Sequence, residues 1–239
     1  MKTSSLSTQQ DSSPLRVAVI STGIDAVTVP QVEQGWKISV HGEKLQVEAT
    51  QADSVGRGTV LAQGLLEECS NVVFVGIDIF NGQSKTTSTL LLKALEKALD
   101  AKCDVVVVCV YSFNVDKGPR FEKVCAYAHR HQIPIIASAV ENKHSYPSQI
   151  ETVLGTLSHQ DCHDYMYCYD TEIFEVSDVR RGLYVVNGWF DNQYWGAEMA
   201  AMRLGGRVCR WMQEGISYAG LSDVLVLNTR IPFAEFDFA

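Results

Sequence analysis

The chain has 239 residues, and 46% of them are hydrophobic, which is enough to bury a substantial core within one domain. A formal net charge of −8 argues against nucleic acid or an anionic membrane as the main partner. No stretch is apolar over the length needed to cross a bilayer. We therefore expect one domain over residues 15–239, preceded by a disordered leader rich in Ser, Thr and Gln over residues 1–14.

The seven cysteines are odd in number, and several of them lie within apolar strand or helix patterns. Such residues are typical of buried free thiols in a reducing compartment and not of a disulfide framework. The location expected from this pattern is the cytoplasm.

Short apolar runs alternate with helical patterns along the first part of the chain. Runs typical of buried strands cover residues 16–20, 72–76, 104–111 and 133–139. Helical patterns cover residues 61–69, 91–99 and 121–131. Residues 36–49 alternate around a His-Gly-Glu turn, which predicts a peripheral hairpin. The alternation of strands and helices predicts an α/β fold with a mostly parallel sheet covered on both faces.

The pattern is less regular after residue 140. One further strand is expected at residues 153–156, and a long helix is expected from about Trp195 to Glu214. Gly205 and Gly206 lower the helix propensity of that segment, so we expect another backbone to pack closely there.

Two other features of the C-terminal part have alternative interpretations. A basic stripe on the long helix is expected to be a solvated face together with Glu214, or else a docking surface for an acidic partner; it consists of Arg203, Arg207 and Arg210. The aromatic tail over residues 228–239 is expected to pack on its own domain, and the alternative is that it adds to a partner's sheet or cleft.

A glycine-flanked loop runs from Asp53 into the first helical pattern. Gly56, Gly58 and Thr59 allow a tight turn and a close approach of the backbone. A loop-to-helix corner of this kind directs free amide groups and one side chain into a cleft, and that side chain is Arg57.

Residues 53–62 resemble the motif Asp-x-x-Gly-His-Gly-Thr-x-x-Ala of the subtilisin-like serine proteases, with Arg57 in the place of the histidine. Residues 17–25 are similar to the strand of that family that ends in Asp-Thr/Ser-Gly, with Ser21 in the place of the catalytic aspartate. Residues 196–201 resemble Gly-Thr-Ser-Met-Ala, with Glu198 in the place of the nucleophilic serine. These motifs occur in the family's order, and the resemblance implies a three-layer, doubly wound subtilisin-like fold.

Two more segments extend the resemblance. Residues 104–111 are similar to the family's strand beside the bound substrate, with Cys109, Val110 and Tyr111 in the place of Ser-Leu-Gly. The resemblance makes these three residues the expected peptide-binding groove. Residues 135–147 resemble the family's Ala-Ala-Gly-Asn segment, and the oxyanion asparagine falls on Glu141 by strict count, or on Asn142 if one residue is inserted.

The chemistry of that family fails at all three triad positions. An arginine remains protonated and has no acceptor, so Arg57 cannot serve as a general base. Glu198 has no hydroxyl to attack an amide, and Ser21 has no imidazole to orient. We therefore expect a pseudoprotease with no catalytic residues, and the alternative is a hydrolase rebuilt around Glu198 or a cysteine.

A positive role is also expected for these substitutions. If the fold holds, Arg57 and Glu198 project from two helix N-termini into one cleft and form an ion pair, with Ser21 as a hydrogen-bonding neighbour. The alternative hypothesis is that the positions drifted once activity was lost.

The function expected from the resemblance is that of a peptide- or protein-binding scaffold, including one that assists an active subtilisin-like homologue or a pathway that modifies a peptide natural product. A homo- or hetero-oligomer, no cofactor, no nucleic acid and no membrane partner are expected. One segment contains two histidines and two cysteines, which are side chains that zinc binds: His159, Cys162, His163 and Cys168. Their spacing matches no closed zinc pattern, so no metal is expected.

Overall fold

The computed structural model describes most of the chain. The described residues are 13–42, 44–141, 143–160, 162, 166–170 and 182–232, with the backbone alone described at 166–170, 182 and 229–232. The expected leader therefore lies almost wholly outside the described residues. Within the described part of the chain, no helix combines the length and the apolar character that crossing a membrane requires.

The strands are β1 (Leu15–Ser21), β2 (Val32–His41), β3 (Lys44–Ala49), β4 (Val72–Asp78), β5 (Val105–Val108), β6 (Ile135–Ser138), β7 (Val153–Leu157), β8 (Met166–Asp170), β9 (Gly182–Val185), β10 (Trp189–Phe190), β11 (Gln193–Tyr194) and β12 (Thr229–Pro232). The helices are α1 (Arg57–Glu68), α2 (Ser88–Asp100), α3 (Gly118–Arg130), α4 (Ala197–Gln213) and α5 (Leu221–Leu227), with short 3-10 turns at Val115–Lys117 and Tyr218–Gly220.

One large sheet crosses the molecule in the order β12-β8-β9-β7-β6-β5-β1-β4-β2-β3. Every neighbouring pair from β2 to β9 in that order is parallel. The strands β3 and β8 each pair antiparallel with their inner neighbours. This topology confirms the predicted α/β fold with a mostly parallel sheet.

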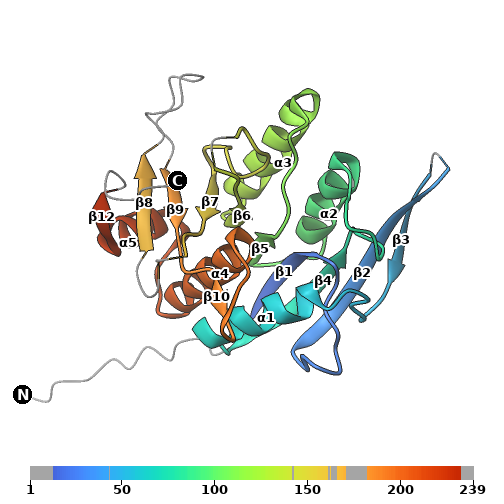
Figure 1. Cartoon of the computed structure of the whole chain (residues 1–239), viewed down its shortest axis with the longest axis horizontal. Coiled ribbons are helices and arrows are strands. Elements are labelled where there is room, and N and C mark those ends of the chain that lie inside the picture. The colour runs from blue at the N-terminus through green and yellow to red at the C-terminus, as the bar shows by residue number, and fades with distance from the viewer. Residues whose placement is uncertain are drawn as a thin grey trace, which may run out of the picture.

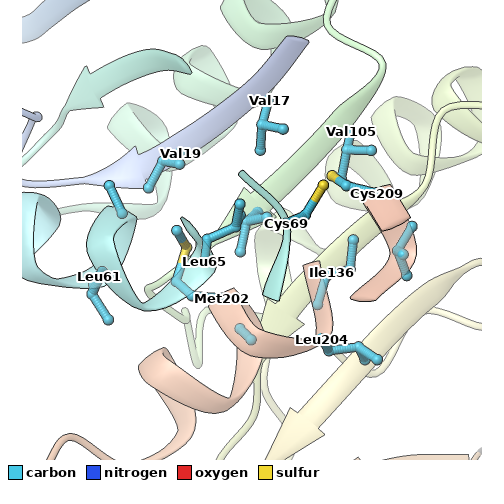
Figure 2. Packing of buried hydrophobic residues seen from close by; sticks show 14 of the residues in the cluster. Val17, Val19, Leu61, Leu65, Cys69, Val105, Ile136, Met202, Leu204 and Cys209 are labelled. Atoms are coloured by element: carbon cyan, nitrogen blue, oxygen red, sulfur yellow. The ribbon is translucent and has the colours of Figure 1, made fainter. Parts of the chain in front are cut away.

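Helices cover both faces of the sheet (Figure 1). Along β1, Val17 and Val19 join the apolar core beneath α1 and α4, whereas Ala18 and Ile20 join the core beneath α2 and α3. This alternation is expected of a central strand, because successive side chains point to opposite faces. Figure 2 shows the first of these cores, in which side chains of α1 and α4 meet those of the sheet.

The two helices over the first core lie unusually close together. A Cβ atom added at Gly206 of α4 would be 2.8 Å from the backbone oxygen of Leu65 in α1, and one at Gly205 would be 2.7 Å from Cγ2 of Val107. The predicted close approach at these glycines is confirmed.

Two arginines of the basic stripe of α4 do not face solvent as expected, whereas Arg210 is 46% exposed. Arg203 contacts Glu67 at 2.9 Å, and both Arg203 and Arg207 contact Glu68 at 3.2 and 3.3 Å. Arg210 completes the group at 3.8 Å from Glu68. The close packing of the two helices places the stripe over the glutamates at the end of α1, so the arginines bind their own chain.

Two element boundaries differ from the sequence-based prediction, and two elements were not predicted at all. The central strand is shorter than residues 104–111, because the chain leaves the ladder after Val108 and Ser112 pairs instead with Tyr146. The long helix begins at Ala197, since Gly196 has a non-helical backbone with φ of 72° and ψ of −150°. The helix α5 and the strand β12 were not predicted.

The start of the aromatic tail joins the chain's own sheet, where β12 pairs with β8. This agrees with the first interpretation of the tail over residues 229–232. Residues 233–239 lie outside the described residues.

Candidate functional site

The loop before α1 is held by one carboxylate. Oδ1 of Asp53 accepts a hydrogen bond from the backbone N–H of Gly56 at 2.8 Å, and its Oδ2 accepts from the N–H and hydroxyl of Thr59, both at 2.9 Å. Gly56 takes the left-handed conformation, with φ of 85°, immediately before the helix. These contacts place Arg57 at the first helical position, as the motif predicts.

The loop that follows β1 lies against this corner. The backbone N–H of Gly58 donates to the hydroxyl of Thr22 at 3.0 Å. A Cβ atom at Gly58 would lie 1.9 Å from the carbonyl oxygen of Gly23, so no other residue fits there without a rearrangement. The carboxyl end of β1 and the N-terminus of α1 are thereby fixed next to each other.

Ser21 is the last residue of β1 and is fully buried. Its hydroxyl finds no hydrogen-bond partner among the described residues, which contradicts the expected role as a hydrogen-bonding neighbour of the ion pair. The physical reason is reach: a serine oxygen lies one bond beyond Cβ, whereas an aspartate would extend one carbon further.

Arg57 and Glu198 meet across the gap between two helices. Glu198 lies in the first turn of α4, and Nη1 of Arg57 is 3.4 Å from its Oε1. The two side chains are 32% and 25% exposed, so the pair is partly shielded from water. The guanidinium carbon of Arg57 also lies 5.4 Å from the ring centre of Phe80. The predicted pairing of these two residues is confirmed.

Burial governs the electrostatics of Glu198. Burial raises the pKa of this carboxyl above its ordinary value, and the nearby Arg57 guanidinium lowers it by a smaller amount. Arg57 cannot act as the base that a serine hydrolase needs, because a guanidinium has no acceptor.

A pocket of about 610 Å³ opens beside the ion pair. Arg57 and Glu198 lie at its boundary, and Leu91 and Val110 contribute apolar surface. Two aromatic rings, 42% and 49% exposed with centroids 5.1 Å apart, also line it; they belong to Tyr111 and Phe113. The space suits an extended chain with an apolar or aromatic side chain.

The three predicted groove residues do not all face this pocket. Val110 and Tyr111 line it, but Cys109 does not. Cys109 is fully buried on the α1 and α4 side of the sheet, where its Sγ donates to the backbone oxygen of Glu198 at 3.8 Å. Burial raises the pKa of this thiol well above its usual range, and the neighbouring Glu198 adds to the effect.

The remaining sequence-based candidates lie elsewhere or are not described. Glu141 occupies a turn after β6 and does not line the pocket, while Asn142 lies outside the described residues. Cys162 is buried and His159 is half-buried, while His163 and the side chain of Cys168 lie outside the described residues. Within the described part of the chain, no group of three or more His, Cys, Asp or Glu side chains is arranged to hold a metal ion.

Several pocket residues were missed by sequence reasoning. Phe80 and Phe113 follow the ends of β4 and β5, where ligand contacts are common in parallel sheets, so their position was the available signal. Residues 84–88 also line the pocket. Within this segment Thr87 caps α2, since its hydroxyl accepts from the backbone N–H of Leu90 at 3.3 Å.

Comparison with solved structures decides the fold. The nisin leader peptidase of Lactococcus lactis matches with a TM-score of 0.69 and 13% identity, over 92% of this chain and 84% of that one. The chain has a subtilisin-like fold. A cold-adapted subtilisin-like serine proteinase (TM-score 0.64, 15% identity, 90% and 82% covered) and a lanthipeptide protease (0.59, 16%, 87% and 74%) also match.

No family model and no curated protein matches the sequence. The three-dimensional structure therefore shows a subtilisin-like fold, but the sequence identities to the matching proteins are too low to assign their substrates or activities to this chain.

Proposed function

We propose that this protein holds an extended peptide in the pocket beside Val110 and Tyr111 and does not cut it. The observation that carries the proposal is the contact between Arg57 and Glu198, which occupies the positions where the subtilisin-like proteases have their base and nucleophile. The pocket next to the pair supports peptide binding, because it joins apolar surface to exposed aromatic rings and polar groups.

The absence of cutting follows from proton chemistry. Amide hydrolysis by a serine nucleophile requires an acceptor for the hydroxyl proton and a donor for the leaving nitrogen. Arg57 offers only donors, and the substitution at position 198 leaves no hydroxyl to activate. Binding without turnover therefore remains the main use of the site.

The proposed setting is a peptide-processing pathway in a reducing compartment. Two of the matching structures are those of a lanthipeptide protease and a nisin leader peptidase, which supports a context of modified peptides. Six cysteines within the described residues are free and buried, in keeping with a cytoplasmic location. We propose a peptide precursor or an active homologue as the partner.

A library of blocked synthetic peptides of about eight residues, varied at every position, tests the proposal by affinity selection and mass spectrometry. We expect retained peptides that stay intact. Replacing Tyr111 by Ala should weaken the binding of a selected peptide about tenfold, because a large exposed contact is lost. The matched control is Tyr127→Ala, which removes a tyrosine of similar exposure on α3 and should change binding less than about twofold.

If both variants bind the selected peptide equally well, this pocket is not the peptide-binding site. Cleavage of peptides by the pure protein would contradict the proposal in a different way and would favour a second function, hydrolysis by a rebuilt site. One observation supports that alternative: the raised pKa of Glu198 suits a carboxyl that acts as a proton donor. In that case Glu198→Gln would abolish turnover while leaving peptide binding intact.

A further inference from the structure

The hairpin of β2 and β3 ends the sheet with an open edge. The strand β3 is the last in the sheet order and pairs only with β2 among the described strands. All six of its residues are exposed, and the hairpin extends beyond the helices (Figure 1). An uncovered edge of this kind is a template for pairing with another strand.

The backbone groups of β3 alternate between its partner and the open side. Thr50 donates its N–H to the carbonyl of Gly35 at 2.9 Å, which sets the alternation of the antiparallel ladder. The even-numbered residues 44, 46 and 48 therefore direct their N–H and C=O groups to β2. The groups of Leu45, Val47 and Ala49 point outward and are available to a further strand.

The side chains divide the hairpin into two faces. Val40, Leu45 and Val47 are 48%, 42% and 38% exposed and lie on one face, because Val40 is directly opposite Leu45. The same face continues to Ile38, which is opposite Val47 and is fully buried in the core beneath α2. The outer half of this apolar face is left open.

The charges on the other face of β3 make the strand complementary to itself. Lys44 stands near its start and Glu48 near its end, with Gln46 between them. We propose that two copies of this chain associate through β3, antiparallel, with Lys44 opposite Glu48 of the second copy and Gln46 opposite its own equivalent. The joined molecules then share one continuous sheet.

The backbone pattern allows only registers that set odd residues opposite odd residues, and the charges select one of them. Leu45 faces Val47 of the second copy, and both residues direct their backbone groups outward, so each such pair exchanges two hydrogen bonds. The apolar side chains of both copies fall on the same face and form one band. A shift by two residues either way sets Lys44 opposite Gln46 or Thr50 and loses both ion pairs.

The same features favour a second copy over an unrelated peptide. The strand has no proline, and its two charged residues are the ones that pair in the proposed register, so they do not protect the edge against self-association. A contact of one strand pair and a few apolar side chains is small, so we expect a dissociation constant of about 10 μM.

Sedimentation velocity of the full-length protein between about 1 and 200 μM tests the proposal, and we expect a monomer–dimer equilibrium over this range. Lys44→Glu alone sets two carboxylates against each other across the interface, and Glu48→Lys alone sets two lysines together. Each variant should raise the dissociation constant about tenfold or more. An equimolar mixture of the two variants should dimerise again, because each pair is then of opposite charge.

Matched controls separate this effect from net charge and folding. Lys123→Glu and Glu122→Lys make the same charge changes at exposed positions of α3 and should leave the dissociation constant within about twofold of the unaltered protein. Glu48→Lys also sets a lysine opposite Lys37 within its own hairpin, so each variant is compared by circular dichroism. Recovery of the dimer when the Lys44→Glu and Glu48→Lys variants are mixed does not depend on that comparison.

A backbone variant gives a second test. Val47→Pro removes an outward N–H that β2 does not use, and it should abolish the dimer without altering the hairpin ladder. A monomer at every concentration would overturn the proposal and leave the edge to a strand of another protein. A dimer that withstands both charge variants and does not change on mixing would overturn it as well, since another surface would then hold the copies together.

Discussion

At the scale of single residues, the site is built around a charge pair. Arg57 and Glu198 occupy the first turns of α1 and α4, where the helix N-terminus favours a carboxylate and disfavours a guanidinium. The N-terminus of α4 thus stabilises the charge of Glu198, and the charge of Arg57 is stabilised by Glu198 and by the ring of Phe80. The charges at positions 57 and 198 therefore depend on each other, whereas independent drift would not produce such a dependence.

The raised pKa of Glu198 gives the pair a pH dependence of known sign. The folded protein binds a proton at this carboxyl at a higher pH than the unfolded chain, whose value is near the ordinary 4.5. Its contribution to stability is therefore fully present below about pH 4.5 and is lost as the pH rises through the folded value.

Replacing Glu198 by Gln should remove this dependence. We expect the unfolding free energy of the variant to increase relative to that of the unaltered protein as the pH rises from 4 to 8. Urea unfolding at several pH values measures the difference. The control Glu214→Gln, an exposed position at the end of the same helix, should show no such trend. A difference of opposite slope would show that pairing with Arg57 outweighs burial.

The buried thiols should be unreactive in the native protein. Burial raises the pKa values of Cys103 and Cys125 to about 12 and that of Cys109 well above its usual range. We expect iodoacetamide to alkylate these residues at least about 100-fold more slowly in the folded state than in urea at neutral pH, as measured by peptide mass spectrometry. Rapid native alkylation of Cys109 would instead support a relocated nucleophile.

At the scale of elements, the packing of α1 against α4 depends on Gly206 and on one shared carboxylate. Glu68 is 12% exposed and lies within 4 Å of three arginines, of which Arg203 and Arg207 are 14% and 15% exposed. Arg203 also donates to the backbone oxygen of Trp189. The cluster connects the two helices whose first turns carry the site.

Removing this carboxylate should be costly. Glu68→Ala should destabilise the fold by about 2 to 3 kcal/mol, because buried arginines lose their common acceptor. Urea unfolding measures the loss. The matched control Glu67→Ala removes a 53% exposed carboxylate from the same helix end and should cost less than about 1 kcal/mol. Equal costs would mean that Arg203 and Arg207 find other acceptors.

The elements that build the site could be predicted from sequence, and the reasons are local. Asp53, Gly56 and Gly58 carry a turn chemistry that only one loop-to-helix geometry satisfies, so the position of Arg57 followed. The facing of Cys109 follows from strand alternation: Cys109 continues the face of Val105 and Val107, whereas Val110 continues the face of Val106 and Val108. The resemblance placed residues 109–111 together in one groove and did not take that alternation into account.

At the scale of the whole molecule, the parallel core could be predicted because each strand is a continuous apolar run that only a sheet covered on both faces explains. The C-terminal elements could not. The helix α5 has seven residues, too few for a clear period, and β12 pairs with β8 rather than with a sequence neighbour. The solvent exposure expected of Arg203 and Arg207 was also wrong, since a helix face does not reveal which neighbour will cover it.

The direction of the sheet limits what two associated copies can do. The strands between β2 and β9 in the sheet order all point the same way, and the pocket lies beyond the ends of β4 and β5, so each molecule carries its pocket at one pole. A two-fold axis through antiparallel β3 edges reverses that polarity. The pockets of a pair would then open toward opposite sides, and each copy would bind its own ligand, with two ligand molecules per pair.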